Sequence, residues 1–176
     1  MELDATPLKP AAPRKESLSK MDDYFAILTD AERRMFLAIA ESAHQLGYRA
    51  KRDKTRSVSY TFTHRKIKKT LLRFAFNRDK PILKIRFCAT QQYSIFFHEA
   101  IRRTIEEYNF KYTGCYGCGK CDGIEGYWYE YPDGSKYFRC GTELIEIGDI
   151  LHLPLEELLT MFRNQHNSYL ADPQVS

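Results

Sequence analysis

Four of the chain's five cysteines share one stretch of sequence. Cys115, Cys118 and Cys121 follow one another at intervals of three residues, and Cys140 comes 19 residues after Cys121. At this spacing a tight turn can direct several sulfur atoms at one ion, and the glycines between the cysteines free the backbone to wrap around it. Because a closed structural site needs four ligands, the sequence predicts one metal centre on these four cysteines.

Two kinds of metal centre fit the cysteine pattern. The Cys115–Lys120 stretch resembles a zinc knuckle, and Cys140 followed by glycine resembles half of another, although a regular zinc ribbon would have its fourth cysteine at Tyr137. The triple run with a remote fourth cysteine also resembles the cluster loop of bacterial ferredoxins. One Zn²⁺ is therefore the expected cofactor, one [4Fe–4S] cluster the alternative, and reduced thiols without a metal the third possibility.

Other catalytic constellations are missing from the sequence. We find no Gly-rich phosphate loop, no nucleophile elbow and no thioredoxin-type cysteine pair. The His98-Glu99 pair does not complete a zinc-protease motif, because Arg102 occupies the position of its second histidine. His152 is an alternative fourth metal ligand, and Cys88 is expected to lie on a strand away from the cluster. These features favour a non-enzymatic protein.

The composition predicts a soluble protein. No apolar run approaches the roughly 18 residues of a membrane helix, and the N-terminal segment lacks the apolar core of a secretory signal. We therefore expect a cytoplasmic location, where thiols stay reduced and clustered cysteines favour metal or redox chemistry over disulfides.

Charge is distributed unevenly along the chain. Residues 48–86 contain 14 Lys or Arg and two acidic residues, whereas the whole chain has a net charge of +4. A cationic block of this kind predicts binding to nucleic acid or to an acidic protein surface. The alternatives are a solvated sheet face and pairing with the acidic C-terminal part of the chain. The candidate polyanion-binding residues are Lys66, Lys68, Lys69, Arg73, Lys84 and Arg86.

Periodicity predicts the elements of the first half. Residues 1–20 lack any pattern and are expected to be a disordered tail. A capping box from Thr29 to Glu32 predicts a helix that ends at Gly47. Three strands with alternating apolar residues follow at 57–63, 71–76 and 83–88, and their short connections predict an antiparallel meander with one apolar face.

The second half is predicted to begin with a helix at 93–108. The cysteine loop follows, then an aromatic hairpin whose strands, 127–131 and 135–140, flank a Pro-Asp-Gly turn. A short strand at 143–147 and a helix from Pro154 complete the chain.

The predicted fold class is α+β: an antiparallel three-stranded meander covered by helices, a Cys-rich loop, an aromatic β-hairpin and a C-terminal helix. Residues 21–176 form a single domain in which the four-cysteine metal loop spans 112–141. Between residues 22 and 170 this order resembles small, uncharacterised microbial α+β domains. That resemblance implies no activity.

Overall fold

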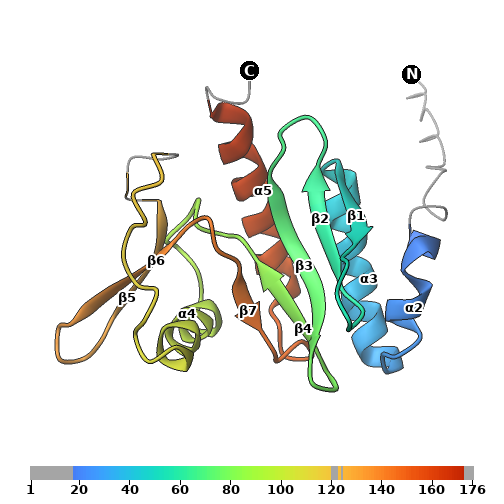
Figure 1. Cartoon of the computed structure of the whole chain (residues 1–176), viewed down its shortest axis with the longest axis horizontal. Coiled ribbons are helices and arrows are strands. Elements are labelled where there is room, and N and C mark those ends of the chain that lie inside the picture. The colour runs from blue at the N-terminus through green and yellow to red at the C-terminus, as the bar shows by residue number, and fades with distance from the viewer. Residues whose placement is uncertain (1–17, 120–122, 124, 173–176) are drawn as a thin grey trace, which may run out of the picture.

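The computed structural model describes residues 18–119, 123 and 125–172 (Figure 1). The fold is α+β, with an antiparallel sheet in the order β1-β2-β3-β4-β7 and a separate hairpin, β5-β6. The strands are β1 (Tyr48–Arg52), β2 (Tyr60–His64), β3 (Thr70–Asn77), β4 (Lys80–Ile85), β5 (Gly126–Glu130), β6 (Lys136–Cys140) and β7 (Ile145–Ile147). The helices are α2 (Asp22–Phe25), α3 (Asp30–Gln45), α4 (Ile95–Glu107) and α5 (Leu155–Ala171), preceded by the 3-10 turn η1 (Ser19–Met21).

Helix α3 begins and ends as its sequence predicts. The Glu32 amide donates to Thr29 Oγ1 at 3.3 Å, and the Glu32 carboxylate accepts from the Thr29 amide at 2.9 Å. This reciprocal pair satisfies two backbone donors that a helix start leaves open. After the helix, Gly47 has a φ of +91°, and a Cβ there would lie 2.6 Å from His64 Nε2. Glycine is therefore required at this C-terminal cap by both conformation and space.

The three predicted strands are β2, β3 and β4, and an additional strand precedes them. In β1 only Tyr48 is fully buried, and the remaining positions are partly or fully exposed. It pairs antiparallel with β2, so the meander has four strands instead of the predicted three. The register aligns Phe62, Leu72 and Ile85 across β2, β3 and β4. These aligned side chains form the apolar face that the alternation predicts.

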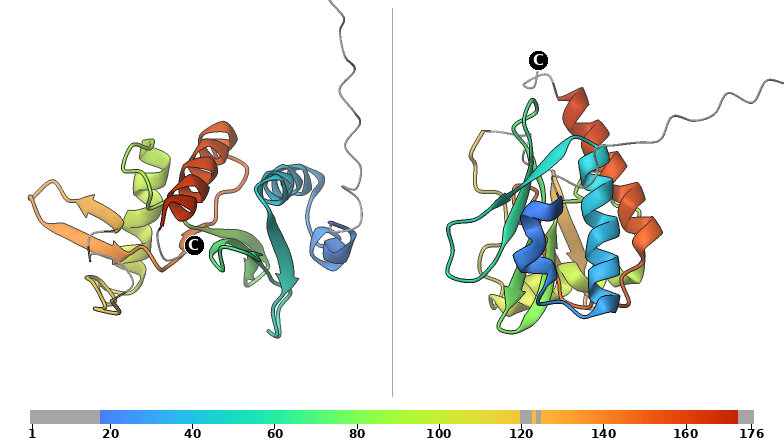
Figure 2. Two further views of the ribbon diagram at one scale, coloured as in Figure 1. Left: turned by 90° about the horizontal axis from the view of Figure 1, so that it is seen from above. Right: turned by 90° about the vertical axis from the view of Figure 1, so that its right-hand side faces the viewer.

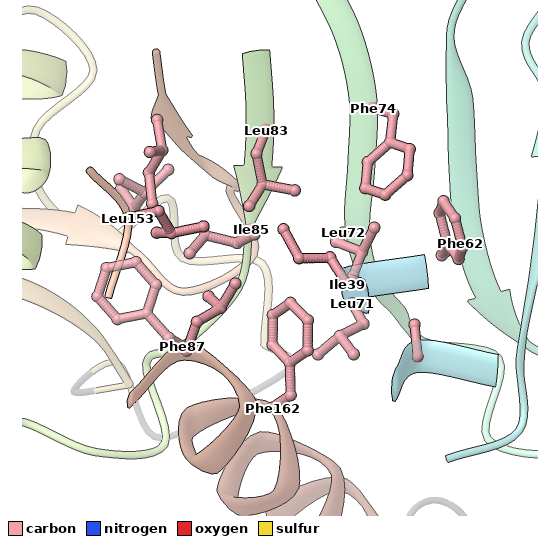
Figure 3. Close-up of a cluster of buried hydrophobic side chains, with 14 of the residues drawn as sticks. Ile39, Phe62, Leu71, Leu72, Phe74, Leu83, Ile85, Phe87, Leu153 and Phe162 are labelled. Carbon is pink, nitrogen blue, oxygen red and sulfur yellow. The ribbon is translucent and has the colours of Figure 1, made fainter. Parts of the chain in front are cut away.

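Helices α3 and α5 cover that apolar face of the sheet (Figure 2). Ile39 of α3 and Phe162 of α5 point into the same cluster as Phe74, Leu83 and Phe87 (Figure 3). All five side chains have zero exposed area. Full burial of each such side chain is worth about 1.5–3 kcal/mol. The core is thus made from the sheet and its two covering helices.

Helix α4 packs at the β7 end of the sheet, and the hairpin β5-β6 lies beyond it (Figure 1). Strand β7 pairs with β4, although 59 residues separate Ile85 from Ile145 in sequence. The C-terminal helix α5 begins directly after Pro154. Of the predicted N-terminal tail, residues 1–17 lie outside the described part of the chain, and the next residues begin the turn η1.

None of the described helices is long and apolar enough to cross a membrane.

Candidate metal centre

The segment after α4 carries the first cysteines alongside the hairpin. Asn109, Phe110 and Tyr112 have positive φ angles of 50°, 62° and 57°, which are uncommon for residues other than glycine. The turns that they form bring the chain to the edge of β6, where the Gly114 amide donates to the Phe138 carbonyl at 2.7 Å. Residue 115 therefore begins its loop next to the strand that ends in Cys140.

Two described glycines lie close to the sulfur of Cys115. The Gly117 amide donates to Cys115 Sγ at 3.4 Å. Gly117 and Gly119 have left-handed φ angles of 61° and 71°. A Cβ built on Gly123 would lie 3.6 Å from the same sulfur. Backbone amides directed at a cysteine sulfur are common around metal-bound thiolates.

Cys140 lies at the end of β6 and is 3% exposed. Its partner in the hairpin register is Gly126. A Cβ on Gly126 would lie 2.3 Å from the Arg139 carbonyl, so only glycine lets the two strands approach this closely. The Cys140 sulfur lies 3.2 Å from Thr142 Oγ1. Cys140 is two residues further along β6 than Phe138, whose carbonyl accepts the hydrogen bond from the Gly114 amide.

The described cysteines do not form a complete ligand set. Cys115 and Cys118 are exposed, whereas Cys140 is buried. Within residues 18–119, 123 and 125–172, no group of three or more His, Cys, Asp or Glu side chains is placed to hold a metal ion. Cys121 lies outside the described residues, so the four-cysteine centre remains a prediction. An all-sulfur donor set suits zinc or an iron–sulfur cluster.

Cys88 lies closer to the cysteine region than the sequence predicts. It follows β4, and its sulfur would be 2.9 Å from a Cβ on Gly141, the residue after Cys140. The thiol lies 3.8 Å from the Gly141 carbonyl and 3.6 Å from Gln165 Oε1, both acceptors. Burial raises its pKa to about 11. Since a protonated thiol is a poor ligand, this environment favours a packing role.

Glu143 joins the cysteine loop to the hairpin. Its carboxylate accepts from the Tyr116 hydroxyl and forms an ion pair with Arg139. Its carbonyl accepts from Tyr127, a fully buried side chain, at 3.2 Å. Burial, followed by the bond to Glu143, raises the pKa of Tyr116 to about 12. Sequence reasoning missed Arg139 and Glu143, which link the segments that carry Cys115 and Cys140.

Most of the candidate polyanion-binding residues have partners within the molecule, which is one of the alternatives that the sequence leaves open. Asp53 pairs with Arg73 at 2.9 Å, and Glu146 pairs with Lys84 at 3.2 Å. Two further members of the set, Lys69 and Arg86, contact the end of α5: Lys69 pairs with Asp172 at 3.6 Å, and Arg86 donates to Tyr169 at 3.1 Å. Lys66 and Lys68 are exposed in the turn between β2 and β3. Four of the six predicted residues therefore have contacts within the molecule.

The remaining candidates show no assembled catalytic group. The His98 ring packs 4.6 Å from the ring of Tyr93. His152 is exposed and pairs with Asp149 at 2.8 Å. An open hollow of about 500 Å³ between α4 and β7 is lined by Arg103, Thr104, Glu106, Glu107, Glu146 and Gly148. These lining residues include neither a cysteine nor a histidine.

Comparison with known proteins finds no match: no protein-family model, no curated protein and no solved structure matches this chain. The case for a function therefore rests on the residues of the chain and their geometry.

Proposed function

We propose that this chain is a non-enzymatic metal-binding protein that holds one Zn²⁺ through Cys115, Cys118, Cys121 and Cys140. The observation that carries the proposal is the environment of the Cys115 sulfur, which accepts the Gly117 amide inside a loop built on left-handed glycines. Backbone donors aimed at a sulfur are the arrangement that stabilises a metal-bound thiolate. The hydrogen bond from Gly114 to β6 supports Cys140 as the fourth ligand.

Bound zinc would supply a structural link and no redox chemistry. The four cysteines would join the loop after α4 to the end of β6 and so stabilise a glycine-rich segment. The buried core of sheet, α3 and α5 does not include Cys115 or Cys118. The proposed metal therefore organises a surface for binding a partner and is not needed to assemble the core. We assign the protein to the cytoplasm, because reduced thiols are required to hold the metal.

The test is metal analysis of protein purified without oxygen. We expect about one equivalent of zinc per chain and a colourless solution. Cys118→Ser should lower the bound zinc strongly, and Cys88→Ser, a matched control outside the ligand set, should retain it. A brown protein that contains iron and sulfide would show that the centre is a [4Fe–4S] cluster and not zinc. Less than about a tenth of an equivalent of either metal would refute the metal centre.

We propose a second, weaker activity for the turn between β2 and β3: contact with a polyanion such as nucleic acid. Its support is that Arg65, Lys66 and Lys68 are all exposed in this turn. Replacing Lys66 and Lys68 by Gln should weaken binding to mixed-sequence single-stranded DNA and reduce its salt dependence. Arg73→Gln is the comparison, since Arg73 already pairs with Asp53. Undetectable DNA binding at low salt would rule this activity out.

A further inference from the structure

Aromatic side chains gather where the chain leaves α4 and runs beside the hairpin β5-β6. The Phe110 ring centre lies 4.7 Å from that of Tyr137 and 6.0 Å from that of Tyr131. Tyr108 and Tyr112 make a second group, with ring centres 5.5 Å apart. These five residues form the aromatic surface.

Arg139 joins the two groups of rings. It follows Tyr137 by two residues on β6, so both side chains lie on the same face of the hairpin. Its guanidinium is 5.5 Å from the centre of the Tyr108 ring. Much of the aromatic surface is open, since Tyr112 is 59% exposed, Tyr108 42% and Phe110 39%. Adjoining exposed apolar side chains mark contact sites, which makes this surface a candidate for binding a partner.

The backbone that carries these rings is strained. Phe110 and Tyr112 have φ angles of 62° and 57°, in the left-handed region that bulky residues rarely adopt. Such conformations cost energy and are concentrated at functional positions. Glycine would adopt them freely. Two exposed aromatic residues at such positions therefore favour a use for their rings in binding.

The surroundings of the aromatic surface are acidic. Residues 106–143 contain seven acidic and four basic residues. Glu106 accepts from the Tyr131 hydroxyl at 3.0 Å, and Glu143 pairs with Arg139. An occupant that combines apolar contact with positive charge therefore complements this surface.

The sequence of this chain contains a segment of matching chemistry at residues 7–15, outside the described part: Pro-Leu-Lys-Pro-Ala-Ala-Pro-Arg-Lys. The segment has three basic residues and no acidic one, and its prolines recur at every third position. In a polyproline II helix, which has three residues per turn, Pro7, Pro10 and Pro13 would share one edge. Proline-rich segments of this kind bind surfaces lined by aromatic side chains.

One chain cannot place residues 7–15 on its own aromatic surface. The Lys20 carbonyl accepts from Tyr60 of β2 at 2.7 Å, whereas the hairpin lies beyond β7 and α4, at the opposite end of the molecule (Figure 1). The strands from β2 to β7 span about 14 Å, and α4 adds about 10 Å. The five residues from Lys15 to Lys20 reach at most about 18 Å. A second copy must therefore supply the segment.

We propose that the aromatic surface binds residues 7–15 of a second copy of this chain. The three prolines contact the exposed rings, and the basic residues of the segment face the acidic side chains around them. Two copies that exchange these segments form a dimer with two equivalent contacts. This interaction goes beyond the proposed function and does not require the metal centre.

The experiment measures self-association of the full chain by sedimentation at increasing concentration. The tail variant replaces Pro7, Pro10 and Pro13 together by Ala, and the surface variant is Tyr112→Gly. Because glycine adopts the φ of this position freely, the surface variant should stay folded, which circular dichroism and Trp128 fluorescence check.

We expect the parent protein to dimerise and each of the two variants to do so about tenfold more weakly or less. The control is Leu151→Ala, at a site that is 55% exposed and outside the aromatic surface, and it should match the parent. Added salt should also weaken the dimer, because the contact includes opposite charges. A dimer that both variants leave unchanged would overturn the proposal.

Mixing the two variants gives a sharper test. The tail variant keeps its aromatic surface, and the surface variant keeps its proline-rich segment. The mixture should therefore associate through one contact, although each variant alone has none. A mixture that associates no better than its components would contradict the exchange of segments.

A labelled peptide of residues 5–17 tests the source of the occupant. Fluorescence anisotropy should show binding to the tail variant, and adding Tyr112→Gly to that variant should weaken binding about tenfold. If the peptide binds but the parent stays monomeric at every concentration, the second copy is refuted as the source, and a proline-rich segment of another protein takes its place. If the peptide does not bind and the parent stays monomeric, the aromatic surface is not a docking site for such segments.

Discussion

The molecule has two regions that are stabilised in different ways. In the body, formed by the five-stranded sheet with α2, α3 and α5, side chains such as Phe36, Phe62 and Phe74 have no exposed area. In the lobe, formed by residues 108–119, 123 and 125–143, Tyr112 is 59% exposed and Tyr116 49% exposed. The body is held by apolar burial. The lobe joins that core through the buried side chain of Tyr127, which packs on Phe87, and otherwise depends on hydrogen bonds, ring contacts and, as proposed, a metal. Removing the metal should therefore affect the two regions unequally.

Two probes distinguish the regions. Trp128 is the only tryptophan of the chain and lies in the hairpin, with its ring centre 4.8 Å from that of Phe138. Its fluorescence therefore reports on the lobe. The long helices α3 and α5 belong to the body, so far-UV circular dichroism reports mainly on the body.

The largest effect is expected from Phe74→Ala in the body. The Phe74 ring lies 4.7 Å from Phe36 and 4.8 Å from Phe62, centre to centre, so its removal leaves a cavity. The free energy of unfolding should fall by about 3–5 kcal/mol. Urea denaturation followed by circular dichroism measures the change, and Leu170→Ala, at a site that is 58% exposed, is the control. A loss as small as that of the control would contradict a body stabilised by apolar burial.

Gly126→Ala should destabilise the lobe alone. The added methyl group would lie 2.3 Å from the Arg139 carbonyl and 2.4 Å from the Phe138 ring. Overpacking of this kind costs about 1–3 kcal/mol. We expect Trp128 fluorescence to change at lower urea while the circular dichroism transition stays in place. Gly134→Ala is the comparison, because a Cβ there meets no atom within 4 Å, although its φ of +84° also carries strain. Coincident shifts of both probes would show that the two regions unfold together.

Acid should weaken the body through His64 and His166, whose ring centres are 5.7 Å apart. Burial lowers the pKa of both; Lys66 and Arg49 lower the pKa of His64 further, and His64 lowers that of His166. As the pH falls, these two histidines therefore bind protons in the unfolded chain at a higher pH than in the folded chain. The contribution of the two histidines to the free energy of unfolding is complete above the ordinary pKa of about 6.5 and declines as the pH falls below it.

The pH effect is expected to be smaller than that of Phe74→Ala, and His166→Asn should reduce it. Urea denaturation at about pH 7.5 and about pH 5 measures it. A protein more stable at the lower pH would contradict this sign.

The smallest effect on the body is expected from Cys118→Ser or from a chelator. Cys118 is exposed and lies outside the buried core. The circular dichroism signal should stay unchanged, whereas amides of residues 113–119 should exchange faster with solvent. Because the buried core does not include this loop, the expected change is limited to the lobe. If the helical signal collapses, the two regions are not independent.

Much of the fold is predictable because its signals are local. The capping box marks the start of α3, and alternation marks β2, β3 and β4. The turn of the hairpin follows from its sequence, since Asp133 Oδ1 accepts from the Ser135 amide at 2.9 Å. Strand β1 escaped prediction because it lies at the edge of the sheet and buries little beyond Tyr48. The pairing of β7 with β4 also escaped, since no local pattern specifies so distant a partner.

The candidate site is only partly predictable from the sequence. Cysteine spacing indicates the kind of ligand, but charge runs do not reveal their partners, such as Glu146 beside Lys84. Arg139 could have been noticed, because strand alternation puts it on the same face as Tyr137. Its link to Glu143 depends on how the chain turns after Cys140, which is a property of the folded structure.

The pairing of β4 with β7 has a consequence for the order in which the chain folds. The chain between β4 and β7, which includes α4 and the hairpin, must form a closed loop before these two strands can pair. The β1–β4 meander can form from contacts between near neighbours, so we expect it to form early, with β7 joining late. A link between Cys115 and Cys140 would shorten the loop that must close between β4 and β7. The late pairing of β7 with β4 would then be faster.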